Sequence, residues 1–304
     1  MIHSSLLDVI GNTPVVRLPA FSAETGFDVY AKLESLNLGG SHKARIALAM
    51  IRDAEERGIL VPGSGQTLIE PSGGNTGIGL AIAANILGYR LVLVIPDNYS
   101  AEKQQLLRLY GAQVVLSDSR RGNNSHGERA MQLQLENPGY VMLNQQRNPA
   151  NPEIHRRSTA QEILRDFAAG APDCLVAGIG TGGHLTGLGE SLKARWPTLG
   201  VFGVEPEECD LLRNRHAPHG IQGLSIGLVP AIVNLSVLDG MIKVSRHDCL
   251  DRIRRTMRED GLSLGLSSAA NLVAIARMRD EWMKGTRVLT LVYDSVDGYL
   301  PELA

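Results

Sequence analysis

Lys43 is the residue of this chain whose position most directly suggests chemistry. It follows Gly39-Gly40-Ser41 and opens a run that is predicted to be helical from Ala44 to Arg57. The positive end of a helix dipole disfavours the charged form of a lysine. In a buried pocket, the dipole and desolvation would both favour the neutral, nucleophilic amine. A solvent-exposed lysine without a role is the alternative, and two glycine-rich loops further along the chain favour the first interpretation.

The first glycine-rich loop covers residues 70–77, between a predicted strand at 67–70 and a predicted helix at 75–87. Its glycines allow backbone N–H groups to converge at a helix N-terminus, which suits an anion such as a carboxylate. A tight turn without a ligand would need fewer glycines. It would also not need the hydroxyls of Ser72 and Thr76 or the amide of Asn75, so the loop predicts an anion site.

The second glycine-rich loop covers residues 178–184, again between a predicted strand and a predicted helix. Gly178, Gly180 and Gly183 fit the GxGxxG pattern, and Glu205 ends the following strand, so a dinucleotide-binding oxidoreductase is one interpretation. A phosphate site needs the same geometry. A lysine amine, a carboxylate loop and a phosphate loop together are what an enzyme that uses pyridoxal phosphate requires, and this combination favours the second interpretation.

Apolar strands alternate with amphipathic helices along most of the chain, which predicts an α/β fold with parallel sheets covered on both faces. At 304 residues, two subdomains are expected. Strands are predicted at 15–18, 29–33, 67–70, 91–95, 113–116, 174–177, 201–204 and 288–292. Helices are predicted at 44–57, 75–87, 101–110, 152–167, 185–196, 247–260 and 268–283. Residues 120–125 are predicted to form a loop that faces the substrate, and residues 206–232 an irregular segment.

The composition is that of an ordinary globular protein, with 43% hydrophobic and 20% charged residues. A net charge of −2 gives no field that would attract nucleic acid or an anionic membrane. Three cysteines without CxxC spacing, Cys174, Cys209 and Cys249, predict buried thiols and neither a disulfide nor a metal site. The first residues show no signal-peptide pattern, and no apolar run reaches membrane-spanning length. A cytoplasmic protein is expected.

Several motifs in a fixed order make the chain resemble the cysteine synthase (O-acetylserine sulfhydrylase) and cystathionine β-synthase family, which are fold type II pyridoxal phosphate enzymes. The resemblance extends over nearly the whole chain. The matching stretches lie at residues 6–14, 40–43, 72–77, 95–97, 148–152, 180–183, 204–206 and 265–268.

The resemblance implies a role for each matching residue. Lys43 would form the Schiff base with the cofactor and remove the substrate Cα proton, and Asn75 would donate a hydrogen bond to the 3′-oxygen of the cofactor. Ser267 would meet the pyridine nitrogen, where a serine suits β-elimination chemistry better than transamination. The substrate carboxylate would be surrounded by Ser72, Gly73, Asn75, Thr76 and Gln145, with Gly223 at the mouth of the site. The cofactor phosphate would be held by Gly180, Thr181, Gly182, Gly183 and His184. Without the resemblance, Ser267 would be interpreted as a helix N-cap and Gln145 as a surface amide.

The resemblance also implies the organisation and reaction of the whole protein. A small mobile subdomain would cover residues 35–144 and carry the carboxylate loop. Residues 1–34 and 145–304 would form the large subdomain, with the cofactor between the two. The expected reaction is β-replacement on an O-activated L-serine, above all O-acetyl-L-serine with sulfide to give L-cysteine and acetate. A homodimer is expected, with small molecules as its other partners and neither nucleic acid nor membrane.

The chain departs from the family pattern at five positions: Leu38 before the lysine loop, Ala44 after the lysine, Gly73 in place of serine, Gln146 in place of phenylalanine and His184 in place of threonine. His184 could donate a charged hydrogen bond to the phosphate. Gly73 and Gln146 concern substrate choice, so a nitrogen or bulkier nucleophile, as in diaminopropionate-precursor or cystathionine synthesis, is an alternative. O-phosphoserine is another, suggested by Arg120, Arg121 and Arg147, although these arginines also suit a solvated basic face. An inactive homologue that acts as a binding protein is the alternative outside catalysis.

Overall fold

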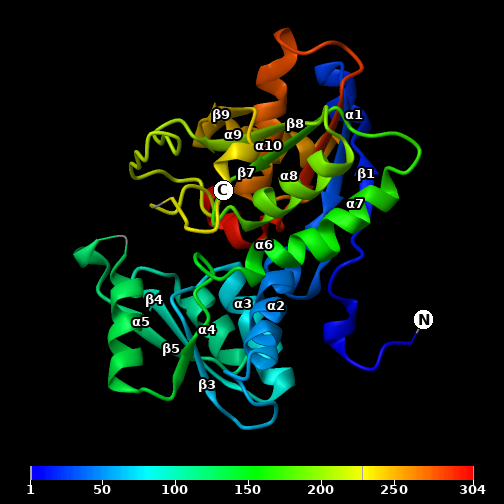
Figure 1. Cartoon of the computed structure of the whole chain (residues 1–304). Coiled ribbons are helices and arrows are strands. Elements are labelled where there is room, and N and C mark those ends of the chain that lie inside the picture. The colour runs from blue at the N-terminus through cyan, green and yellow to red at the C-terminus, as the bar shows by residue number, and fades with distance from the viewer. Residues whose placement is uncertain (1, 123, 228, 304) are drawn as a thin grey trace. The chain divides into compact units, whose positions relative to one another are not determined.

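Two β-sheets organise the chain, as the alternation of predicted strands and helices requires. The computed structural model describes residues 2–122, 124–227 and 229–303 (Figure 1). Asn123, in the loop predicted at 120–125, and Leu228, in the irregular segment predicted at 206–232, lie outside the described residues. Contacts divide the chain into unit 1, Met1–Ile10 with Asn37–Asn151, and unit 2, Gly11–Leu36 with Pro152–Ala304. The bounds of unit 1 differ from the 35–144 expected for the small subdomain: its main stretch runs from Asn37 to Asn151, and it includes Met1–Ile10.

Unit 1 contains a sheet that has four parallel strands within the described residues. Its order is β5-β4-β3-β6, with β3 at Thr67–Glu70, β4 at Arg90–Pro96, β5 at Gln113–Ser117 and β6 at Tyr140–Met142. The sequence predicts the first three, because each is a run of mainly apolar residues. The three residues of β6 are too few to give a period.

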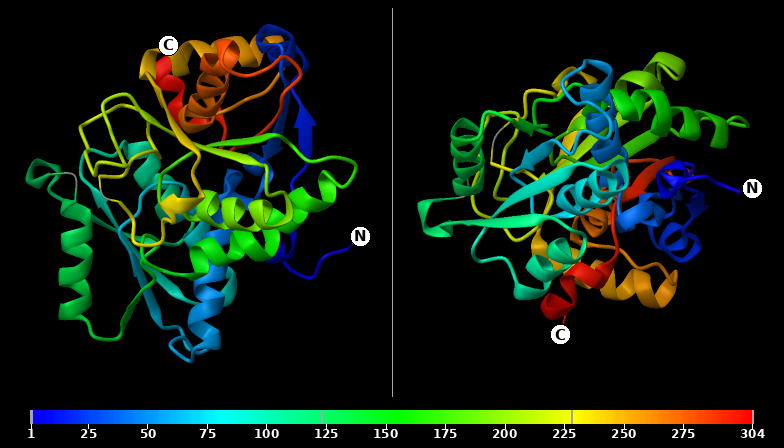
Figure 2. Two further views of the ribbon diagram at one scale, coloured as in Figure 1. Left: turned by 45° about the horizontal axis from the view of Figure 1, so that its top comes forward. Right: turned by 90° about the horizontal axis from the view of Figure 1, so that it is seen from below.

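The helices of unit 1 are α2 (Lys43–Glu56), α3 (Asn75–Leu87), α4 (Ala101–Leu109) and α5 (Ser125–Glu136). Successive residues of a strand point to opposite faces of a sheet. Val92 and Val94 of β4 accordingly pack with Ala130 of α5, whereas Leu93 lies towards α3. Figure 2 shows α5 and α2 on opposite sides of these strands. The sequence analysis missed α5.

Unit 2 contains a sheet that has six strands among the described residues, in the order β1-β2-β10-β7-β8-β9. The strands are β1 (Val15–Arg17), β2 (Asp28–Leu33), β7 (Cys174–Gly178), β8 (Gly200–Pro206), β9 (Gly240–Val244) and β10 (Arg287–Val292). Only β1 and β2 pair antiparallel; the other pairs are parallel, so the predicted α/β class is confirmed. The last strand of the chain, β10, lies in the middle of the sheet.

The helices of unit 2 cover both faces of this sheet. The longer ones are α8 (Gly183–Arg195), α9 (Arg246–Glu259) and α10 (Leu266–Arg277). The helix predicted at 152–167 is α6 (Ala150–Ile154), a π-helical turn (His155–Thr159) and α7 (Ala160–Asp166), and α11 covers Leu300–Leu303. One buried cluster joins α9 and α10 to the sheet, and a second joins α7 and α8 to it. No helix in the described part of the chain is both long and apolar enough to cross a membrane.

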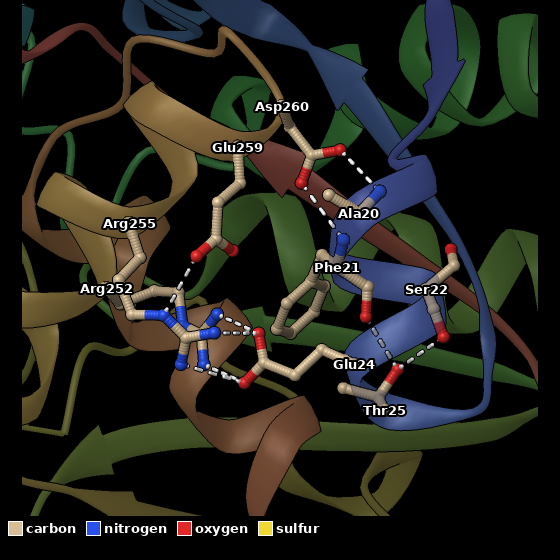
Figure 3. Close-up of polar contacts among 9 residues, drawn as sticks. All are labelled: Ala20, Phe21, Ser22, Glu24, Thr25, Arg252, Arg255, Glu259 and Asp260. Atoms are coloured by element: carbon tan, nitrogen blue, oxygen red, sulfur yellow. Dashed lines mark hydrogen bonds and ion pairs between the residues drawn. The ribbon is translucent and has the colours of Figure 1, made fainter.

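A short helix that the sequence analysis missed, α1 (Pro19–Thr25), is fastened to α9 by charged side chains (Figure 3). Glu24 accepts two hydrogen bonds of 2.7 Å from Arg252 and further ones from Arg255. The Asp260 carboxylate accepts the backbone N–H groups of Ala20 and Phe21 at 2.9 and 3.1 Å. Asp260 therefore caps a helix whose own N-cap, a leucine, has no side-chain acceptor.

Candidate active site

Lys43 is the first residue of α2, where the sequence analysis places it. Its backbone N–H donates to the Ser41 hydroxyl at 3.3 Å, and the Lys43 side chain is half-buried between the buried residues His42 and Ala44 along the chain. The first turn of α2 contains no acidic residue that would offset the positive end of the helix dipole. The lysine therefore lies at the positive end of the helix dipole, with no acidic residue in that turn.

Helix α3 lies directly against α2 and brings the second predicted group close to the first (Figure 1). Gly79 of α3 makes the approach possible. A Cβ atom at this glycine would lie 3.0 Å from Ala47 Cβ and 3.1 Å from the Lys43 carbonyl oxygen, which is tighter than ordinary packing. The N-terminal turns of α2 and α3 are consequently neighbours within unit 1.

The loop at residues 72–77 connects β3 to α3, which begins at Asn75. Gly77 packs so closely on the Ser72 carbonyl that a Cβ atom would overlap it. The Thr76 hydroxyl donates to Gln145 Oε1 at 2.7 Å, and the Asn151 amide donates to the Gln145 carbonyl at 2.8 Å. Gln145 is therefore half-buried and tied to the loop, and the surface-amide interpretation is wrong.

Glu70, which the sequence analysis mentions only as the start of this loop, holds the two segments together. It ends β3 with a fully buried carboxylate that accepts the backbone N–H groups of Asn144 and Gln145 at 2.8 and 3.0 Å. Burial raises the pKa of Glu70 to about 7, although the two N–H groups act in the opposite direction. A charged residue at the end of an otherwise apolar strand is the only signal for it in the sequence.

The loop at residues 178–184 lies in unit 2, between β7 and α8. Gly182 is the N-cap of α8 and has a φ of 74°, a conformation that favours glycine. A Cβ atom at Gly180 would overlap the Gly223 carbonyl, and the Ser225 N–H donates to the Ile179 carbonyl at 2.8 Å. The segment around Gly223 therefore lies directly on this loop.

Ser267 completes the group of predicted residues in unit 2. A Cβ atom at Gly223 would lie 3.8 Å from the Ser267 hydroxyl, so these two residues are neighbours. The N-cap of α10 is Gly265, and the alternative interpretation of Ser267 as an N-cap is therefore wrong. Ser267 is buried, and its hydroxyl has no hydrogen-bond partner among the described residues, which leaves it available to a ligand.

His184 has a partner that the sequence does not indicate. Its Nε2 atom lies 3.0 Å from the hydroxyl of Tyr293, which follows β10 and also accepts the Gly178 N–H at 2.9 Å. Burial raises the pKa of Tyr293, so this phenol stays protonated and its O–H can donate to His184. The Ser268 hydroxyl accepts the Tyr293 N–H at 2.9 Å. Tyr293 thus links the 178–184 loop to the start of α10.

The residues of unit 2 fit a phosphate-bearing pyridine ring. The loop offers backbone N–H groups at the N-terminus of α8, where the positive end of the helix dipole favours an anion such as a phosphate. Ser267 adds a neutral hydroxyl close to Gly223. A neutral hydroxyl suits the pyridine nitrogen of pyridoxal phosphate.

Comparison with known families decides which cofactor this geometry serves. The family model described as "Pyridoxal-phosphate dependent enzyme" matches residues 6–294. The chain belongs to this family. It is an enzyme that depends on pyridoxal phosphate, which supplies an electron sink for reactions at the α- and β-carbons of amino acids.

The relatives of this pyridoxal-phosphate dependent enzyme match it over nearly its whole length. It is 39% identical to a cysteine synthase of Staphylococcus aureus over 297 residues, 97% of this chain and 95% of that protein. It is also 39% identical to O-ureido-L-serine synthase of Streptomyces lavendulae over 300 residues, 98% of this chain and 91% of that protein. A crystal structure of O-ureido-L-serine synthase matches with a TM-score of 0.94, covering 99% of this chain and 94% of the other.

The family assignment removes the dinucleotide alternative, and the structure shows why the pattern was misleading. Glu205 would have to present its carboxylate to a ribose. Instead it is buried and accepts the Leu211 N–H at 2.8 Å, and burial raises its pKa. The GxGxxG residues lie in the loop between β7 and α8, whose geometry suits the phosphate of pyridoxal phosphate as well as that of a dinucleotide.

Cys209, His216 and His219 are the residues of unit 2 that come nearest to a metal site. Their ligand atoms lie within 4.8 Å of one another. Both ring nitrogens of His219 are engaged, however: Nδ1 accepts the Ile221 N–H at 3.2 Å, and Nε2 lies 3.2 Å from the Ser225 carbonyl. His219 is therefore a brace for the segment that carries Gly223. All three cysteines are buried and free, as predicted.

Proposed function

We propose that this enzyme replaces the β-substituent of an O-activated L-serine, with O-acetyl-L-serine and sulfide as its substrates and L-cysteine and acetate as its products. The assembly of Lys43, the 72–77 loop and Gln145 in unit 1 supports this proposal most strongly, because it combines an amine with an anion site. The similarity to cysteine synthase over 97% of the chain supports the same reaction.

Each predicted residue has a task in this proposal. Lys43 would hold the cofactor covalently, and its amine would carry the Cα proton of the substrate. Ser72, Gly73, Asn75, Thr76 and Gln145 bind the substrate carboxylate, and Asn75 also orients the cofactor ring. Gly180, Thr181, Gly182, Gly183 and His184 hold the phosphate, while Ser267 faces the ring nitrogen and Gly223 borders the entrance. A small subdomain that closes, a homodimer and a cytoplasmic location remain part of the proposal.

Hydroxyurea is the second candidate nucleophile. Its oxygen, added to the same O-activated serine, would give O-ureido-L-serine, the compound in the name of a relative that is as similar as the cysteine synthase. A structure of the K43A mutant of that relative contains O-ureido-L-serine. In this chain, the half-buried amide Gln146 follows Gln145, where the family commonly has phenylalanine, and an amide could bind the urea group.

O-phosphoserine has less support as the donor. Arg120 forms two hydrogen bonds of 2.9 Å with Asp118, and Arg121 lies 3.8 Å from Glu128. Both side chains are exposed, and Arg147 is exposed as well. Ion pairs of this kind suit a solvated surface, which was the alternative interpretation of these arginines. Retention of Lys43, Asn75 and Ser267 argues against an inactive homologue.

The test is a competition between donors and nucleophiles on the purified enzyme loaded with pyridoxal phosphate. O-acetyl-L-serine or O-phospho-L-serine is supplied with sulfide, hydroxyurea or an amine, and acetate or phosphate and the new amino acid are quantified. The proposal predicts the highest kcat/KM for O-acetyl-L-serine with sulfide. A higher kcat/KM with hydroxyurea would show that hydroxyurea, and not sulfide, is the nucleophile. Release of phosphate without acetate would show that O-phospho-L-serine, and not O-acetyl-L-serine, is the donor. Absence of turnover with every pair would overturn β-replacement.

A further inference from the structure

Tyr99 occupies the space that a side chain at position 73 would need. A Cβ atom at Gly73 would lie 2.7 Å from Tyr99 Cε1 and 2.6 Å from Ile95 Cγ2. Such distances are too short for real atoms, so a serine at this position would require both Tyr99 and Ile95 to move. Gly73 and Tyr99 are therefore a matched pair: the loop loses a side chain where the ring of a second residue packs against it.

Hydrogen bonds of the Tyr99 backbone hold the segment that carries its ring. Tyr99 lies between β4 and α4, its N–H donates to the Pro96 carbonyl at 3.2 Å, and its carbonyl accepts the Gln104 side-chain amide at 3.0 Å. Lys103 Nζ lies 6.0 Å from the ring centroid. These contacts fix the segment that positions the ring beside the 72–77 loop.

The hydroxyl of Tyr99 is available to a ligand. It forms no hydrogen bond with any residue that the structure describes, and the side chain is only half-buried. Burial raises the pKa of the phenol, so it stays protonated at neutral pH and can act as a donor. The hydroxyl is bonded to Cζ, the ring carbon next to the Cε1 atom that touches Gly73.

We propose that Tyr99 determines how the amino-acid substrate is bound: its ring fills the place of the missing side chain at position 73, and its hydroxyl donates a hydrogen bond to the substrate carboxylate. This inference rests on the proposed function, which assigns the 72–77 loop to that carboxylate. A donor on a rigid ring recognises small α-amino acids and gives no advantage to amines that have no carboxylate.

The first test compares L-serine with ethanolamine, which has the same amine and hydroxymethyl groups but no carboxylate. Binding is measured from the change in the absorption band of the bound cofactor, in the wild type, Tyr99→Phe and Tyr110→Phe. Tyr110 is the matched control because it lies at the other end of α4. A lost hydrogen bond to a charged group costs about 1.5–3 kcal/mol, so Tyr99→Phe should raise the Kd for L-serine roughly 10- to 150-fold. The Kd for ethanolamine should not change.

The outcomes separate this inference from the proposed function. If Tyr99→Phe binds L-serine as tightly as the wild type, Tyr99 only fills space and the inference is overturned, whereas β-replacement stands. Equal weakening for L-serine and ethanolamine would also overturn it. If the wild type responds to neither L-serine nor O-acetyl-L-serine, the proposed function fails and the inference fails with it.

A second test uses stability and does not depend on activity. Gly73→Ser should lower the melting temperature, because the new side chain meets Tyr99 and Ile95. Adding Tyr99→Met, which is unbranched and can move aside, should recover part of the lost melting temperature, because only the contact with Ile95 then remains, and should restore the binding of L-serine through the new hydroxyl. Additive losses in the double variant would show that the two positions are not a matched pair.

Discussion

At the scale of single residues, the carboxylate of Glu70 is the group on which the site in unit 1 depends. It binds the backbone of Asn144 and Gln145, and Gln145 in turn accepts the hydroxyl of Thr76. One buried acid therefore fixes the distance between the two segments that we propose bind the substrate carboxylate. The cost to stability is that the protein interior must hold either the ionised carboxylate of Glu70 or a Glu70 carboxyl group that keeps its proton.

Replacement of Glu70 by glutamine should change how stability depends on pH. The pKa of Glu70 is about 7 in the folded protein and 4.5 as an unperturbed group, so between these values the folded state retains a proton that the unfolded state has lost. The free energy of unfolding of the wild type should therefore fall, by up to about 3 kcal/mol, as the pH rises from about 4.5 to above 7. Denaturant titrations at pH 5 and pH 8 should show that the wild type loses this free energy of unfolding and that Glu70→Gln does not. If the free energy of unfolding changes equally with pH in the two proteins, the prediction is contradicted.

The residues that sequence reasoning found and missed differ in a physical way. Lys43, Asn75 and Gly180 lie in local motifs, so glycine spacing and helix starts reveal them. Glu70 and Tyr293 act through contacts with residues more than 70 positions away, and a single sequence carries no pattern for such pairs. Tyr99 was missed for a different reason: its partner, Gly73, is a residue without a side chain.

At the scale of elements, the sequence predicts the strands and helices that are long and regularly patterned. It misses α1, α5, α11, β6 and β9; α11 has only four residues, and each of the other omissions has its own cause. Helix α1 has seven residues and depends on Asp260 for its cap, while β6 has only three residues. Strand β9 lies at the edge of its sheet and is only partly buried, and α5 buries few of its side chains. Tertiary contacts, more than local propensity, determine these elements.

The contact between α2 and α3 should tolerate no larger residue at position 79. Gly79→Val would push α3 away from Ala47 and the Lys43 carbonyl, which should cost about 1–3 kcal/mol of unfolding free energy and weaken the binding of pyridoxal phosphate. Gly139→Val is the control, because a Cβ atom there meets nothing within 4 Å. Chemical denaturation and a fluorescence titration with the cofactor measure the two effects. If Gly79→Val keeps the unfolding free energy and the cofactor affinity of the wild type, the close approach of α2 and α3 has no role.

At the scale of the whole molecule, unit 2 combines an apolar core with charged groups that join distant segments. Lys32 is completely buried, with Nζ 3.0 Å from Glu162 and 2.8 Å from the Thr13 carbonyl. Glu24 joins α1 to two arginines of α9 more than 220 residues later (Figure 3). Such pairs are sensitive to the loss of one partner, since the other is left with an uncompensated charge.

Glu24→Gln should destabilise the protein most near neutral pH. The hydrogen bond from Arg252 holds the pKa of Glu24 below its usual value of 4.5, so its contribution is present above this pH and is lost as the pH falls through the lower, folded-state pKa. We expect a loss of about 1–2 kcal/mol at pH 7, reduced by salt, and a smaller difference in acid. Glu259→Gln, which affects only Arg255, is the control with a smaller effect. An equal loss in both variants would contradict the role of Glu24.

The central claim is that Lys43 carries the cofactor, and the most direct measurement locates the covalent attachment. The purified protein, loaded with pyridoxal phosphate, is reduced with borohydride and digested, and the modified peptide is identified by mass spectrometry. We predict that the pyridoxyl group is found on Lys43, that Lys43→Ala loses both the label and β-replacement while it stays folded, and that Lys284→Ala, at an exposed lysine of unit 2, keeps both. A label on another lysine, or a fully active Lys43→Ala protein, would contradict the account.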